Sequence, residues 1–122
     1  MVDPLTRPVF MRVRRACLAL PETSEKAAWG HPTFRVSRKT FVAFEMIDGR
    51  PSVAFRLPRE SCGELIDEGR AFATPYGRNL WASVWVDLPV DARELRWLVM
   101  ASYRTVASRR LCALISAPES RD

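Results

Sequence analysis

Histidine and cysteine are scarce in this 122-residue chain, which has one histidine, His31, and three cysteines. The cysteines, Cys17, Cys62 and Cys112, are too few and too scattered for a disulfide framework or a zinc site, and buried, inert thiols are expected there. The sequence also lacks the phosphate loops GxxxxGK[ST] and GxGxxG and the GxSxG nucleophile elbow. We therefore expect no metal, no cofactor and no catalytic residues, and we interpret the chain as a non-enzyme.

Long apolar runs are absent as well. No stretch is apolar for long enough to span a bilayer, and the first ten residues, MVDPLTRPVF, lack the apolar core of a signal peptide. Together with the unpaired cysteines, these absences predict a cytoplasmic location. The length fits one domain over residues 1–122, with a core at about 8–115 and a flexible tail at 116–122.

Positive charge is present in excess and is unevenly distributed. The net charge is +5, from 19 Lys and Arg against 14 Asp and Glu. Residues 1–59 contain 11 basic and 5 acidic side chains, whereas residues 60–122 contain 8 and 9. The basic first half suits a polyanionic partner, although solubility or an arginine-rich genome explains the same composition.

The centre of the chain, Thr33–Leu57, predicts three short β-strands. Apolar and polar residues alternate along this stretch, and two short polar segments, Ser37–Lys39 and Asp48–Arg50, interrupt it. Turns this short join antiparallel neighbours, and Asp-Gly favours a tight hairpin. A further strand is predicted at Leu80–Leu88, with a short one at Ala71–Ala73 before it.

Helical spacing of apolar residues predicts helices on both sides of these strands. The first helix begins at Pro8 and ends before Pro21, and the second covers Arg59–Glu68. The last helix runs from Ala92 to about Arg110, behind an Asp91 cap. Between the first helix and the first strand, residues 22–32 are interpreted as a connector in which Trp29 forms a buried plug.

Several short motifs resemble, in their order and spacing, those of the MmcQ/YjbR family. They cover about residues 10–107 and include Leu20-Pro21, WGHPTFRV at 29–36, Lys39, Phe41, Pro75-Tyr76-Gly77, the Trp81 strand and Ser102-Tyr103. The resemblance implies an α+β fold of two layers with the plan α-β(3)-α-β(2)-α. Its antiparallel sheet carries helices on one face, as in secretion-chaperone-like or YjbR-like folds. The family is often labelled DNA-binding, and the resemblance supplies no catalytic residues.

Strand alternation places a basic and aromatic set of residues on one face of the predicted sheet. If helices cover the face that bears Val53, Phe55, Val84 and Val86, the opposite face displays the remaining alternate positions. These candidate nucleic-acid-binding residues are Arg35, Arg56, Trp81 and Trp85, with Phe41 as a further candidate and Arg38, Lys39 and Arg78 at the edges.

Arginines interleaved with aromatic rings can neutralise phosphates and stack bases. The sequence therefore suggests a binding module for DNA or another nucleic acid. Two alternatives remain. The same face could bind a protein or a small ligand, because aromatic and arginine side chains are also common hot spots. The tryptophans could instead pack against the last helix or Trp97 and leave no site.

Overall fold

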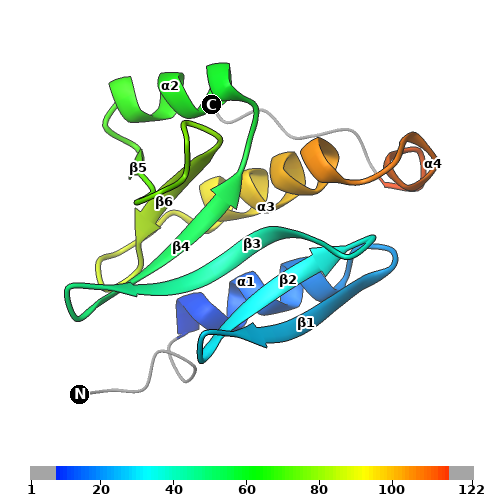
Figure 1. Cartoon of the computed structure of the whole chain (residues 1–122), viewed down its shortest axis with the longest axis horizontal. Helices are drawn as coiled ribbons and strands as arrows, with labels where there is room; N and C mark the ends of the chain where they lie inside the picture. The colour runs from blue at the N-terminus through cyan, green and yellow to red at the C-terminus, as the bar shows by residue number, and fades with distance from the viewer. Residues whose placement is uncertain (1–7, 116–122) are drawn as a thin grey trace.

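The structure, a computed structural model, describes residues 8–115 and consists of one antiparallel sheet flanked by helices (Figure 1). The elements in chain order are α1 (Pro8–Leu18), β1 (Thr23–Ala28), β2 (His31–Val36), β3 (Lys39–Ile47), β4 (Arg50–Arg56), α2 (Arg59–Asp67), β5 (Phe72–Ala73), β6 (Trp81–Trp85), α3 (Ala92–Val106) and α4 (Arg109–Cys112).

The six strands lie in the order β1-β2-β3-β4-β6-β5, and every neighbouring pair is antiparallel. Tight turns at residues 29–30, 37–38 and 48–49 join the first four strands, and both residues of each turn have positive φ. This left-handed geometry matches the natural twist of a hairpin. The prediction of an antiparallel α+β sheet is confirmed.

The helices α1 and α3 cover one face of the sheet, behind the strands in Figure 1. Val53 lies opposite Phe44 on β3 and opposite Val84 on β6, so these three side chains share that face. Val53 and Phe55 are fully buried there, and the half-buried Val84 packs against the same core. The predicted register is therefore correct for the face that the helices cover.

Aromatic rings form much of the contact between the sheet and these helices. Phe10 of α1 meets Phe44 edge-to-face with ring centroids 4.6 Å apart, and Phe41 meets Tyr103 of α3 in the same way at 5.7 Å. Buried aromatic pairs in such T-shaped arrangements stabilise a core beyond their area alone. The Tyr103 hydroxyl also donates a hydrogen bond of 2.9 Å to the Pro21 carbonyl, which fixes α3 to the end of α1.

Phe41 does not join the opposite sheet face, where it was a candidate. The register between β2 and β3 shifts, because Phe34 pairs with Val42 whereas Arg35 pairs with Thr40. Phe41 is therefore the extra residue of a β-bulge, and both Phe41 and Val42 are buried in the core. A bulge breaks the period-two pattern on which the sequence prediction rested.

The predicted connector at 22–32 contains a strand that sequence reading missed. β1 pairs with β2 along its whole length, so four strands precede α2 instead of three. Its sequence, TSEKAA, lacks apolar alternation because β1 is an exposed edge strand held by backbone pairing. Trp29 lies at the turn between β1 and β2 and is 97% exposed, so the prediction of a buried plug was wrong.

The predicted last helix is divided in two. α3 ends at Val106 because Ala107 is extended, with ψ at 156°, and Ser108 then starts α4 by accepting a hydrogen bond from the Leu111 N–H. No helix within residues 8–115 is both long and apolar enough to cross a membrane. The predicted flexible tail at 116–122 lies outside the described residues.

Truncation of Phe55 tests the register of the sheet. Because Phe55 is fully buried, Phe55→Ala should lower the free energy of unfolding by roughly 3–5 kcal/mol, measured by denaturant unfolding. Trp29→Ala removes another aromatic ring, but from an exposed turn, and should change stability by less than about 0.5 kcal/mol. Equal effects of the two substitutions would contradict the assignment of the core face.

Candidate functional site

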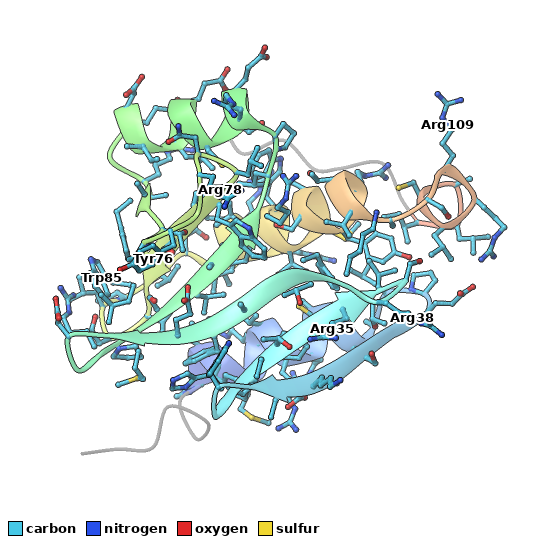
Figure 2. All side chains as sticks on the ribbon, in the orientation of Figure 1. Arg35, Arg38, Tyr76, Arg78, Trp85 and Arg109 are labelled. Carbon is cyan, nitrogen blue, oxygen red and sulfur yellow. The ribbon has the colours of Figure 1, made fainter. Side chains whose placement is uncertain are left out.

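The sheet face opposite α1 and α3, here called the open face, carries most of the candidate residues. Arg56 pairs with Trp81 across β4 and β6, and Ser52 pairs with Trp85, so all four side chains share this face. Arg35 shares it from β2, because it alternates with the buried Phe34 and Val36. Figure 2 looks onto the open face and labels Arg35, Arg38, Tyr76, Arg78 and Trp85. The structure therefore brings together residues from three strands, β2, β4 and β6, and from two loops.

Trp85 is enclosed between two neighbouring side chains. Phe72 of β5 stacks on the indole with ring centroids 4.4 Å apart and an interplanar angle of 23°. Arg50 of β4 lies 3.9 Å above the ring, and two hydrogen bonds of 2.8 and 3.0 Å hold its guanidinium on Asp87. Stacking and cation–π contact therefore occupy the indole from the two sides of β6. Trp85 therefore joins β4, β6 and β5 through side-chain contacts that already engage its ring.

Sequence reading missed Arg50 because the residue falls in a predicted turn. It lies two residues before Ser52 and six before Arg56, so period-two counting from either residue places it on the open face. Arg56 is also engaged. Its Nη1 donates a hydrogen bond of 2.8 Å to the Leu57 carbonyl and one of 3.5 Å to the Leu80 carbonyl. Arg56 thus tethers the end of β4 to the segment before β6.

Four other cations on or beside the open face form no ion pair with any residue between 8 and 115. Arg35 is half-buried, and its Nε is shielded from solvent without a hydrogen-bond partner in the described chain. Three cations are exposed: Arg38 at the turn before β3, Lys39 at the first position of β3, and Arg78 in the loop before β6. The exposed charges of Arg38, Lys39 and Arg78 therefore have no counter-charge from the described chain.

The loop between β5 and β6 folds over the open face and creates a hollow. The Thr74 and Ser83 hydroxyls lie 2.6 Å apart, and Gly77 donates a backbone hydrogen bond of 2.9 Å to the Thr74 carbonyl. The hollow has a volume of about 220 Å³. Its lining consists of Thr40, Ala43, Glu45, Ala54, Thr74, Pro75, Tyr76, Gly77 and Trp81.

Tyr76 is the functional candidate that sequence reading did not select. Its side chain is 100% exposed at the mouth of the hollow, whereas Trp81 is half-buried in the wall. Tyr76 adopts a positive φ of 61°, which is uncommon for a bulky residue and reflects the tight Pro-Tyr-Gly turn. The Pro-Tyr-Gly sequence indicates a turn, but strand alternation predicts side-chain orientation only within strands and therefore did not identify Tyr76.

Glu45 is the acidic member of the hollow. Burial raises the pKa of its carboxyl above the ordinary value of 4.5, and the nearby charge of His31 opposes part of that rise. A partly buried carboxyl can accept a hydrogen bond from an amino group when it is ionised, and can donate one when it is protonated.

Other reactive groups do not converge on this face. Burial raises the pKa of the Cys17 and Cys62 thiols, which disfavours the reactive thiolate form. Within residues 8–115, no group of three His, Cys, Asp or Glu side chains is placed to hold a metal ion.

Comparisons with known proteins agree with this architecture. A model of the YjbR family matches residues 18–105. A crystal structure of a protein from Pseudomonas syringae, a target of the Northeast Structural Genomics Consortium, superposes with a TM-score of 0.60 at 17% sequence identity. The alignment covers 71% of this chain and 89% of that protein, and this likeness shows the fold. No curated protein matches the chain.

Gly77 is expected to be essential to the shape of the hollow. A Cβ at this position would lie 2.9 Å from the Thr74 carbonyl oxygen and 3.0 Å from the Trp81 Cβ. Gly77→Ala should therefore destabilise the protein by about 1–3 kcal/mol in denaturant unfolding. Gly63→Ala in α2 is the matched control, because its added methyl meets nothing within 4 Å. That control should be neutral or should stabilise by about 0.5–1 kcal/mol. A neutral Gly77→Ala would contradict the close packing of the loop.

Glu45 should make stability depend on pH. The pKa of Glu45 is higher in the folded chain than in the unfolded chain, where it is about 4.5. Just above pH 4.5 the folded state therefore binds more protons than the unfolded state, so the free energy of unfolding falls as the pH rises. Glu45→Gln removes the titrating carboxyl and with it this loss of stability. The free energy of unfolding of Glu45→Gln, relative to the parent, should therefore increase as the pH rises above 4.5. Glu64→Gln, on the exposed side of α2, controls for the loss of a carboxylate. A Glu45→Gln effect that stays constant with pH would contradict the raised pKa.

Proposed function

The chain belongs to the YjbR family, and we propose that it is a non-catalytic module that binds single-stranded nucleic acid across its open face. The observation that carries this proposal is the hollow between Tyr76 and Trp81, next to cations without ion-pair partners in the described chain. The three free cysteines support a place for this activity in a reducing compartment such as the cytoplasm.

The hollow suits one planar base. Its volume of about 220 Å³ falls below the roughly 300–1,000 Å³ of typical small-molecule pockets. The two aromatic residues offer a stacking surface, and Glu45 in the same lining can receive an exocyclic amino group. Every base has a flat π-face, so stacking of this kind tolerates different sequences. We assign base stacking to Tyr76 and not to Trp85, because the Trp85 ring already contacts Phe72 and Arg50.

The exposed cations suit the phosphates on either side of that base. Arg78 lies one residue beyond Gly77 of the hollow, and Arg38 and Lys39 lie at the turn before Thr40 in its lining. Arginine can bind a phosphate through two parallel N–H groups. Each phosphate neutralised by a cation releases counterions, so binding should weaken steeply as the salt concentration rises.

The test is fluorescence anisotropy with labelled single-stranded DNA and RNA at two salt concentrations. Tyr76→Ala should weaken binding by about 1–3 kcal/mol, the contribution of one stacked base, whereas Tyr76→Phe keeps the ring and should retain the affinity. Arg38→Ala with Arg78→Ala should reduce the dependence of log affinity on log salt by about 0.7 for each lost phosphate contact. Arg59→Ala with Arg109→Ala is the matched control, because both arginines are exposed on helices (Figure 2 labels Arg109).

The outcomes separate the alternatives. Failure of the parent protein to bind either nucleic acid at low salt would end the proposal. Binding that does not weaken with salt would favour a neutral small ligand or a protein on the same face. Equal losses in the Arg38/Arg78 variant and in the control would place the positive surface elsewhere. We exclude Arg56 from the variants because its hydrogen bonds to Leu57 and Leu80 make it part of the fold.

A further inference from the structure

We infer that a groove between α1 and α3, on the opposite side of the sheet from the open face, binds a small amphipathic anion. Such a ligand has an apolar body and a carboxylate or phosphate group. The inference is independent of nucleic-acid binding, because α1 and α3 form the groove and cover the other face of the sheet.

The groove has an apolar floor and a cationic rim. Its volume of about 810 Å³ lies within the range of small-molecule sites. Val13 and Ala16 of α1 and Leu95 and Val99 of α3 contribute apolar surface, and the small Ala16 and Ala19 side chains leave space between the helices. The rim carries four arginines, Arg12, Arg15, Arg93 and Arg96. The whole site is here called the arginine groove.

Among residues 8–115, no acidic residue lines the arginine groove. Arg12, Arg15 and Arg93 are exposed and form no ion pair with any residue of the described chain. The neighbouring acids have other contacts. Asp91 caps the backbone N–H of Arg93, and Glu94 lies 3.6 Å from Arg70, outside the groove. The positive charges of Arg12, Arg15 and Arg93 therefore lack a counter-charge from the described chain.

The sequence places these cations in like-charged pairs on the two helices. Arg12 and Arg15 are three residues apart on α1, and Arg93 and Arg96 are three apart on α3. Like charges at this spacing repel each other. Arg93 also lies in the first turn of α3, where the helix dipole disfavours a cation. A bound anion would reduce the repulsion within each arginine pair and the unfavourable interaction of Arg93 with the helix dipole. Guanidinium groups also match the geometry of a carboxylate or a phosphate.

The test is a titration of the ¹⁵N-labelled protein, observed by NMR, with decanoate below its micelle concentration. We expect saturable shifts of backbone signals in α1 and α3. Decyltrimethylammonium has the same alkyl chain and the opposite charge, and it should bind at least tenfold more weakly. Arg15→Glu with Arg93→Glu should weaken decanoate binding at least tenfold. Arg59→Glu with Arg109→Glu changes the net charge by the same amount, and its affinity for decanoate should stay within about twofold of the parent.

The inference would be overturned by equal binding of the cationic amphiphile, by equal losses in the two double variants, or by shifts confined to the open face. Binding to phosphatidylglycerol vesicles without binding of free decanoate would assign the groove to a lipid surface and also overturn it. If charge reversal lowers the melting temperature, Arg12→Ala with Arg15→Ala gives the same comparison. Nucleic-acid binding should be unchanged in the groove variants, so this inference and the proposed function fail separately.

Discussion

The rest of the structure depends on the enclosure of aromatic rings between the sheet and the helices α1 and α3. Phe44 and Phe55 project from the sheet, Phe10 and Tyr103 reach toward it from the helices, and Phe41 joins them through a β-bulge. Burial of rings of this size supplies much of the driving force for folding. Because one face of the sheet satisfies that demand, the other face can carry arginine, glutamate and tryptophan.

The open face divides into a structural part and a part available to ligands. The Arg50 guanidinium and the Phe72 ring both contact the Trp85 indole, and these contacts join three strands. Around the hollow, Tyr76 and Arg78 project from a loop without comparable contacts. The same residue types therefore have opposite roles a few residues apart. The difference lies in whether neighbouring side chains already desolvate the ring and pair the charge.

The two proposed sites use positive charge on opposite sides of the molecule. The open face combines cations with aromatic rings and a small hollow, which suits a base and its flanking phosphates. The arginine groove combines cations with aliphatic side chains and a larger volume, which suits an apolar body with an anionic group. Charge alone would not distinguish these ligands. The apolar surface beside each set of arginines gives each site its own chemistry.

The sequence by itself determined the antiparallel sheet and the orientation of its central strands, because short turns and period-two alternation are local properties. It also placed Arg35 and Trp81 on the open face correctly. Only the tertiary structure decided that β1 is a strand, that Phe41 is buried and that Trp85 is occupied. Backbone pairing with β2, a bulge against β2 and contacts from Arg50 and Phe72 cause these outcomes. The contacts of Arg50 and Phe72 with Trp85 join residues far apart along the chain. The β1 strand and the bulge are close in sequence to their partners, but neither shows a period-two pattern of apolar residues.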